Sequence, residues 1–357
     1  MSTSGGTRAI VAALLANIGI AVTKFIAWAL TGSSSMLAES IHSVADSGNQ
    51  VLLLFGGRRA RRAATPRHPF GYGRERYIYA FIVSIVLFTV GGLFALYEAY
   101  HKAGHPEPIT DWQWVPVTVL LVAIILESFS FRTAIVESNM VRGSASWKEF
   151  VRHAKAPELP VILLEDLGAL LGLVFALFGV GMTLATGNGM WDAVGTAMIG
   201  VLLVSIAVIL AIETKSLLLG EGATPEHVAA IERAITEGGD VERIIHMKTL
   251  HLGPEELLVA AKVAVRHDES AVEVARGIDA VEQRIRSAVP IARVIYLEPD
   301  IYSSTAAARG SDRDAAPDGV HGATAAGGGG DGGGGDGGGG DGAGPAGVDA
   351  TGPGEHR

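Results

Sequence analysis

The sequence predicts an α-helical membrane protein with six transmembrane helices, followed by a cytoplasmic ferredoxin-like α+β domain and a disordered Gly/Asp-rich tail. Two observations support this fold class. Hydrophobic residues make up 48% of the 357 residues and charged residues only 18%, more apolar than an ordinary soluble domain. Basic residues gather in two short segments between the apolar runs. An apolar surface of this size indicates a lipid bilayer as its surroundings.

Six apolar windows are predicted to cross the membrane, since a bilayer core of roughly 30 Å needs about 20 helical residues. They are Ala9–Leu30, Leu37–Phe55, Tyr77–Tyr97, Trp114–Ile135, Pro160–Met182 and Trp191–Ile212. The first window is too long for a signal peptide and no convincing small-residue cleavage site follows it, so we interpret it as a membrane helix. Residues 1–219 form the predicted transmembrane domain.

Basic residues mark two of the predicted loops. Between the second and third windows lie Arg58, Arg59, Arg61, Arg62, Arg67, Arg74 and Arg76, and between the fourth and fifth lie Arg142, Lys148, Arg152 and Lys155. The alternate loops carry almost nothing basic beyond Lys102. The positive-inside rule places the basic loops in the cytoplasm, and both termini with them. We therefore expect a multi-pass protein of the cell membrane.

After Leu219 the pattern becomes that of a soluble domain, predicted over residues 220–302. Thr224 caps a helix that begins at Pro225 and runs to about Thr236. The next elements are predicted as a hairpin of Val241–Leu252 and Leu257–Val265, a helix at Ala271–Val289 and a strand at Ala292–Leu297. The order αββαβ is typical of a small ferredoxin-like sandwich.

The remaining residues, 303–357, consist mainly of Gly, Ala, Asp and Ser. A Gly-Gly-Gly-Gly-Asp unit ends at Asp331, Asp336 and Asp341. Such a segment has too few apolar residues to bury a core, which predicts disorder. A calcium-binding β-roll is the alternative, but the period is five residues instead of nine and no apolar residue recurs.

Ionisable residues inside the predicted spans are candidates for function, because a charge in hydrocarbon costs on the order of 3 kcal/mol. In the second span Glu39, His42 and Asp46 are spaced i, i+3, i+7, which places them on one helical face. The fifth span offers Glu165 and Asp166. Adjacent residues diverge by about 100°, so we expect one of this pair to face His42 and Asp46.

Other polar residues in the spans are weaker candidates. Asn17 and Glu127 are expected to form hydrogen bonds between helices, Glu39 can snorkel to the outer interface, and Lys24 either snorkels or pairs with an acid. The sequence contains no cysteine, so a metal would be held by nitrogen and oxygen. One histidine with two or three carboxylates suits Zn²⁺, and also Mn²⁺, Fe²⁺, Co²⁺ or Ni²⁺, whereas copper(I) is disfavoured.

Two segments resemble the cation diffusion facilitator family. They are Thr31-Gly-Ser-Ser-Ser-Met-Leu-Ala-Glu-Ser-Ile-His-Ser-Val-Ala-Asp and His68-Pro-Phe-Gly-Tyr-Gly-Arg-Glu-Arg, within a resemblance that extends from Ala9 to about Asp300. The resemblance implies a homodimer that exchanges a divalent metal for protons by alternating access. It also implies a transport site formed by His42 and Asp46 of the second span and Asp166 of the fifth.

The sequence departs from the family pattern in both segments that could bind metal. Ile162 stands where the family has a His or Asp four residues before Asp166, so Glu165, water or another span has to complete the site. In the cytoplasmic loop Tyr72 stands at the place of a second histidine, which favours a structural role for His68.

The soluble domain does not reproduce the family's usual zinc-binding histidines. His246, His251 and Glu298 lie near the expected strands and are weak candidates, because single histidines on strands are usually surface or hydrogen-bonded residues.

Other functions are disfavoured by missing motifs. The sequence lacks the His-Glu-x-x-His signature, which disfavours an intramembrane zinc hydrolase. It also lacks a Gly-x-x-x-x-Gly-Lys-Ser/Thr loop, which favours a proton gradient over ATP as the energy source. A cation channel remains an alternative. We expect no cofactor apart from the transported metal ion, and no nucleic acid as partner.

Overall fold

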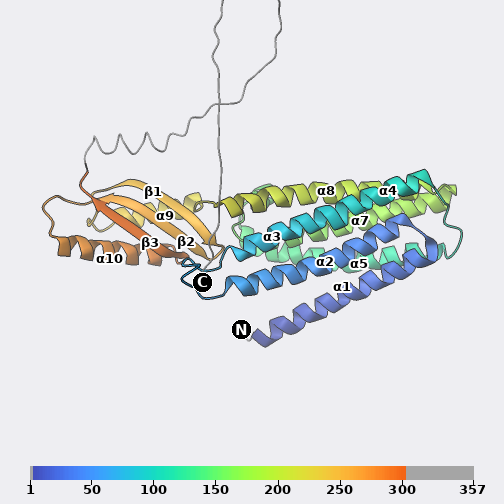
Figure 1. Ribbon diagram of the computed structural model, residues 1–357, viewed down its shortest axis with the longest axis horizontal. Coiled ribbons are helices and arrows are strands. Elements are labelled where there is room, and N and C mark those ends of the chain that lie inside the picture. The colour runs from blue at the N-terminus through green and yellow to red at the C-terminus, as the bar shows by residue number, and fades with distance from the viewer. Residues whose placement is uncertain (1–2, 303–357) are drawn as a thin grey trace, which may run out of the picture. The chain divides into compact units, whose positions relative to one another are not determined.

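The computed structural model describes the backbone of residues 3–302 and the side chains of residues 17–302. The predicted disordered tail and its β-roll alternative lie outside the described residues. Six long helical segments run alongside one another in the first part of the chain (Figure 1). They are α1 (Thr3–Thr31), α2 (Ser34–Ala60), a third segment of α3 (Glu75–Val86), η1 (Leu87–Leu93) and α4 (Phe94–Gly104), α5 (Trp114–Arg142), α7 (Glu158–Thr186) and α8 (Met190–Leu219). Each predicted apolar window lies within one of these segments.

Four of the six segments are long and apolar enough, by length and composition, to cross a membrane. They are Glu75–Gly104, Trp114–Arg142, Glu158–Thr186 and Met190–Leu219. In α1 the described apolar stretch is the shorter Asn17–Thr31, and α2 carries polar residues along its length. The chain is therefore a multi-pass membrane protein. Helix α2 is less apolar because polar residues such as Glu39, His42 and Asp46 lie within it.

Small residues bring α7 and α8 close together. A side chain on Gly179 would meet the Trp191 carbonyl oxygen at 2.9 Å and the Gly195 Cα at 3.1 Å. Such close approach is how membrane helices associate where no hydrophobic force acts between them. Around this contact Leu173, Ile199 and other apolar side chains form one buried core that extends across the bundle.

Two helical elements were not predicted from the sequence. The π-helical turn η1 widens the third segment where Gly92 packs against Val204 of α8. A Cβ atom on Gly92 would lie 2.6 Å from Val204 Cγ2, so only glycine fits there. The short helix α6 (Trp147–His153) lies in the second basic loop, where the Ser146 hydroxyl accepts a hydrogen bond from the Glu149 N–H at 3.2 Å. π-helical turns are often found at functional sites. In this one, a Cβ atom on Gly91 would lie 4.0 Å from His42 Nδ1 of α2.

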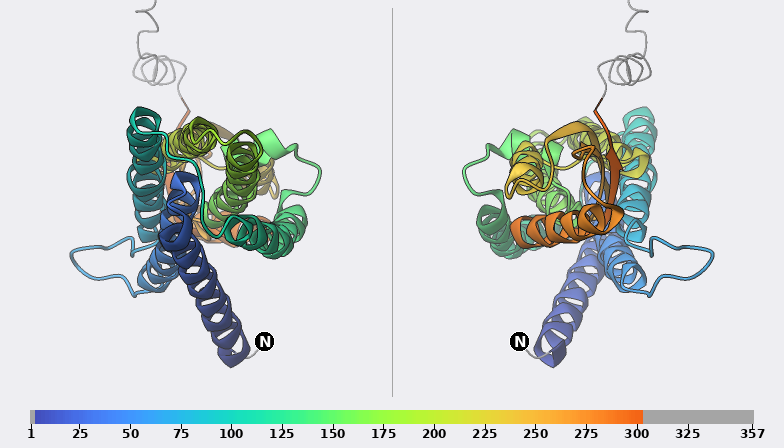
Figure 2. Two further views of the ribbon diagram at one scale, coloured as in Figure 1. Left: turned by 90° about the vertical axis from the view of Figure 1, so that its right-hand side faces the viewer. Right: turned by 90° about the vertical axis from the view of Figure 1, so that its left-hand side faces the viewer.

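The soluble domain has the predicted order αββαβ. Its elements are α9 (Pro225–Thr236), β1 (Arg243–Gly253), β2 (Glu256–Ala264), α10 (Ala271–Ala288) and β3 (Ala292–Asp300). Strand β1 pairs antiparallel with β2, and β2 pairs parallel with β3, in the order β1-β2-β3. The parallel pair requires a crossover, which α10 supplies. Both helices share one core with the sheet, and Figure 2 shows α10 beside the strands.

Local sequence explains how these elements begin and end. Thr224 caps α9 as predicted, and Ser270 with Glu273 forms a reciprocal capping box at the start of α10. Strand β3 continues beyond its predicted end at Leu297, because its parallel pairing with β2 extends to Asp300. There Lys262 forms ion pairs with both Glu298 and Asp300, at 3.1 and 2.9 Å.

Candidate metal-binding cavity

A small cavity lies among α1, α2, α5 and α7, and it contains several of the candidate residues. Its volume is about 20 Å³, which is room for about one water-sized group or metal ion. Its walls are formed by Asn17, Ile20, Ser43, Asp46, Gln50, Glu127, Ser130, Ile162, Glu165 and Asp166. The fold thus brings carboxylates from α2, α5 and α7 to one place.

On α2, His42 and Asp46 lie one turn apart, as the spacing predicted. His42 is 1% exposed, and its Nδ1 lies 3.4 Å from Asp46 Oδ1 without the geometry of a hydrogen bond. Within residues 17–302, neither ring nitrogen of His42 nor Asp46 Oδ1 has a hydrogen-bond partner. Buried polar atoms normally have partners, so these atoms are available to hold a cation or a proton.

The carboxylates of α7 are held by different neighbours. The Asn49 side-chain amide of α2 donates to Glu165 Oε1 at 2.7 Å, and the Ser130 hydroxyl of α5 donates to Asp166 Oδ2 at 2.9 Å. The two side chains diverge, as expected for adjacent helical residues, but both line the cavity. Glu165 points toward α2, which carries His42 and Asp46, and Asp166 points toward the neighbouring helix α5.

Asp46, Glu165 and Asp166 line the cavity, whereas His42 lies one turn from Asp46 and is not a lining residue, and these groups do not form a coordination shell. In the described part of the chain, no three His, Asp or Glu side chains are close enough to hold one metal ion together. Metal binding would therefore require the helices or side chains to move inward. The partners Asn49 and Ser130 are the groups that such a movement would have to release or carry along.

Three of the weaker intramembrane candidates, Lys24, Glu39 and Asn17, form specific polar contacts. Lys24 pairs with Glu39 at 3.1 Å, and both side chains are completely buried, so neither of them snorkels. The pairing predicted as one alternative for Lys24 is confirmed. Asn17 donates to Gln50 of α2 at 3.4 Å, which is the interhelical strut expected of it. Glu127 lines the cavity, and within residues 17–302 it does not form the interhelical hydrogen bond expected of it.

A second, larger cavity adjoins the first. It has a volume of about 750 Å³, and Gln50 and Ile162 line both cavities. Its charged lining residues are Arg58, Arg61, Arg76, Glu137, Glu158, Glu255, Glu256 and Arg293. Arg76 pairs with Glu158 of α7 and, at 3.5 Å, with Glu255 of the β1–β2 turn. Ile162, at the position of the missing family ligand, thus stands where the two cavities meet.

The candidate histidines outside the helices do not come together. His68 packs against Tyr72, with ring centroids 4.7 Å apart, as a structural loop residue. His246 lies on β1, and Glu298 pairs with Lys262. His251 is buried, and its Nδ1 lies 3.3 Å from the Gly253 carbonyl oxygen, to which it can donate. Burial lowers the pKa of His251, which keeps the ring neutral.

One buried carboxylate with a structural role was missed by the sequence analysis. Asp192 of α8 accepts hydrogen bonds from the first turn of α2, including the Ser33 hydroxyl at 2.9 Å and the Ser34 N–H at 2.7 Å. The run Ser33-Ser34-Ser35 was a signal for a helix start, since serine is a preferred cap. Nothing in the sequence indicated that an acid from a helix far along the chain completes the cap.

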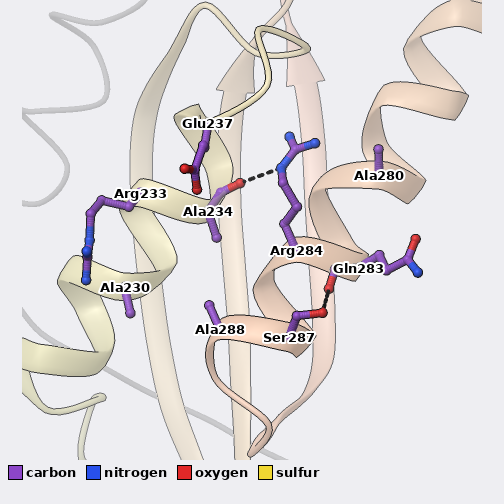
Figure 3. Close-up of a pocket in the computed structure, with 9 residues that line it drawn as sticks. All are labelled: Ala230, Arg233, Ala234, Glu237, Ala280, Gln283, Arg284, Ser287 and Ala288. Carbon is purple, nitrogen blue, oxygen red and sulfur yellow. Dashed lines mark hydrogen bonds between the residues drawn. The ribbon is translucent and has the colours of Figure 1, made fainter.

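A separate hollow lies between α9 and α10 of the soluble domain (Figure 3). It has a volume of about 780 Å³ and is lined by alanines and Ser287 together with the longer polar side chains Arg233, Glu237, Gln283 and Arg284. The Arg284 guanidinium donates to the Ala234 carbonyl at 2.9 Å and pairs with Asp240 at the same distance. None of the residues singled out from the sequence lines this hollow.

Several carboxylates around an internal cavity with a buried imidazole nearby, within a bundle of long apolar helices, are typical of a membrane transporter for cations. The chain's relatives agree with this class. Residues 10–219 match the cation efflux transmembrane domain. The chain therefore belongs to the cation diffusion facilitator family of metal transporters.

Three relatives show the range of similarity. The chain is 32% identical over 242 residues to the human mitochondrial proton-coupled zinc antiporter SLC30A9, covering 67% of this chain and 42% of that protein. It is 25% identical over 258 residues to metal tolerance protein C4 of Arabidopsis thaliana, covering 72% and 56%. It is 26% identical over 271 residues to zinc transporter ZitB of Pectobacterium atrosepticum, covering 75% and 79%. The chain spans about two fifths of the SLC30A9 relatives' length.

Proposed function

We propose that this chain is a secondary active transporter that exports a divalent metal cation, most favourably Zn²⁺, from the cytoplasm in exchange for protons. The observation that carries the proposal is the cavity that joins Asp46, Glu165 and Asp166, beside His42 with both ring nitrogens unpartnered. Nitrogen and oxygen donors in this combination suit zinc. Mn²⁺, Fe²⁺, Co²⁺ and Ni²⁺ accept the same donors and are the alternative substrates.

The ligand set that we propose is His42 and Asp46 from α2 with Glu165 and Asp166 from α7. Glu165 takes the place of the ligand that Ile162 does not provide, because Asn49 holds its carboxylate toward the helix that carries His42 and Asp46. Asp166 reaches the same cavity from the side of α5.

Exchange with protons follows from the chemistry of these groups. Carboxylates and a neutral imidazole bind a metal only when deprotonated, so metal and protons compete for one set of atoms. A metal bound from the cytoplasm would be released on the other side by protonation of the same groups. The names of two relatives, a proton-coupled zinc antiporter and a zinc transporter, support both parts of this proposal.

The larger cavity suggests the side of the membrane from which metal enters the site. That cavity adjoins the candidate site and is lined by Arg58, Arg61 and Arg76 of the first basic loop and its flanks. The positive-inside rule assigns this loop to the cytoplasm. We therefore propose that metal reaches the site from the cytoplasm, in a homodimer of the cell membrane with six spans and both termini inside.

The function is tested with the purified chain in proteoliposomes under an imposed pH gradient, with the five metals in competition. Saturable zinc uptake that stops when the gradient is collapsed is the expected result. Gradient-independent currents would indicate a channel instead. His42→Ala, Asp46→Asn and Asp166→Asn should each reduce transport by more than about tenfold.

Glu165→Gln separates two roles for the second α7 carboxylate. Loss of transport together with weaker zinc binding would confirm Glu165 as the replacement ligand. Zinc binding that is retained but no longer depends on pH would make Glu165 the carrier of the coupled proton. Glu98→Gln is the matched control, because this acid of α4 lines neither the candidate site nor the larger cavity. Transport that survives Asp46→Asn would exclude the proposed site.

Orientation is tested by single cysteines, since the chain has none of its own. An impermeant thiol reagent added to intact cells should fail to label cysteines placed in residues 58–76 or 142–155. Labelling at either position would reverse the proposed topology.

A further inference from the structure

A completely buried ion pair lies beside the candidate metal cavity and has no part in the proposed transport cycle. The Lys24 ammonium of α1 lies 3.1 Å from Glu39 Oε2 of α2 and donates to the Ser43 hydroxyl at 2.7 Å. Both charged side chains are 0% exposed. Glu39 and Ser43 are spaced i, i+4, so they stand one turn apart on one face of α2. Together they hold the ammonium as oxygen ligands hold a cation.

The ion pair with Lys24 uses only one of the two carboxylate oxygens of Glu39, Oε2. In residues 17–302, no hydrogen-bond partner lies within reach of Glu39 Oε1, although the atom is buried. This oxygen points toward α7, because a Cβ atom on Gly172 would lie 2.5 Å from it. Glu39 therefore reaches from α2 toward the helix that carries Glu165 and Asp166. The ammonium binds the other carboxylate oxygen, so this one can coordinate a cation.

The Lys24 ammonium lies next to the candidate metal cavity. Ser43 lines that cavity together with Asp46, and the same Ser43 hydroxyl accepts the hydrogen bond from Lys24. A metal ion in the cavity and the Lys24 ammonium would thus lie on two sides of one serine. Two cations so close together compete for the negative charge of the surrounding carboxylates.

We propose that Glu39 and Ser43 form a second cation subsite and that Lys24 fills it with a tethered positive charge of the chain itself. This inference rests on the proposed metal transport. Carboxylate and hydroxyl oxygens would otherwise offer a divalent metal an additional place next to the transport site. By filling that place, Lys24 limits the negative charge that surrounds a metal ion in the cavity. The bound metal is then held weakly enough to leave.

A purely structural role for the ion pair predicts different behaviour. A pair that only fastens α1 to α2 would, when broken, destabilise the bundle but leave the zinc affinity of the folded protein unchanged. The subsite predicts that zinc affinity follows the charge at the two positions. The two explanations are therefore separated by a binding measurement on folded protein.

The experiment measures zinc binding to the purified full chain in detergent by calorimetry, with transport in proteoliposomes as a second readout. Lys24→Met should bind zinc at least about tenfold more tightly, or bind one additional ion, and should transport it more slowly. Lys24→Arg keeps the charge and should restore wild-type affinity. The double variant Lys24→Met with Glu39→Gln is neutral at both positions and should also return to wild-type affinity.

If Lys24→Met is not recovered as folded protein, the single variant Glu39→Gln tests the same proposal. It leaves an unbalanced ammonium beside the cavity, so zinc affinity should fall by about tenfold. Zinc affinity that stays at the wild-type value in the folded single variants would overturn the subsite and leave the pair as a structural link. Absence of zinc binding by the wild-type chain would instead overturn the proposed function.

Discussion

The contact between Asp192 and the start of α2 leads to a quantitative prediction. Its Oδ1 accepts from the Ser33 hydroxyl at 2.9 Å and the Ser35 N–H at 3.3 Å, and its Oδ2 accepts from the Ser34 N–H at 2.7 Å and the Ser34 hydroxyl at 3.1 Å. The first N–H groups of a helix have no partner within the helix. One buried carboxylate of α8 thus completes the first turn of the helix that carries His42 and Asp46.

Asp192→Asn should destabilise the folded protein strongly. Whichever oxygen becomes the NH₂ group, one backbone N–H and one hydroxyl lose their acceptor. Losing hydrogen bonds to a charged acceptor, and leaving a buried N–H unpaired, should together lower the free energy of unfolding by about 3 to 5 kcal/mol. Ser34→Ala is the control. It removes only a hydroxyl, and the N–H at that position still donates to Asp192, so the expected loss is about 1 kcal/mol.

The assay is reversible unfolding of the purified chain in mixed micelles by titration with sodium dodecyl sulfate, followed by tryptophan fluorescence. Both variants should bind zinc normally once folded, because neither residue lines the candidate cavity. An Asp192→Asn protein no less stable than Ser34→Ala would refute the reasoning, since the carboxylate would then contribute nothing beyond one hydroxyl contact.

Two further predictions concern other parts of the chain. Ile162→His should raise zinc affinity by about tenfold in calorimetry, because Ile162 lines the cavity with Asp46 and Asp166, whereas Ile162→Val should not change it. An unchanged affinity in the folded histidine variant would mean that this position does not face the site. Burial lowers the pKa of His251 below its ordinary value of 6.5, so the unfolded chain takes up the proton first. Stability should therefore be complete above pH 6.5 and decline as the pH falls below it, and a melting series from about pH 7.5 to about pH 5.5 should be flatter for His251→Gln.

Much of the fold could be predicted because its causes are local. Each apolar window proved to lie in a long helix, since a continuous apolar run specifies a helix wherever lipid surrounds it. The hairpin around Gly253-Pro254 and the capped helices of the soluble domain follow from turn and cap residues. The π-helical turn at Leu87–Leu93 could not be predicted, because it arises where Gly92 packs against another helix.

For the candidate site, the sequence by itself determined that His42 and Asp46 share one face of α2, because helical spacing depends only on neighbouring residues. It also showed that Glu165 and Asp166 lie in a membrane helix. The tertiary structure alone decided which groups meet across helices.

Those cross-helix contacts are Asn49 with Glu165, Ser130 with Asp166, Lys24 with Glu39, and Asp192 with Ser34. The spacing of residues along one helix says which side chains point the same way, but it contains no information about the neighbouring helix or its rotation. Those are set by how small and large side chains fit together between helices, as where α7 and α8 meet at Gly179 and Gly195. A cavity walled by four helices is therefore a property of their packing, and of no single segment.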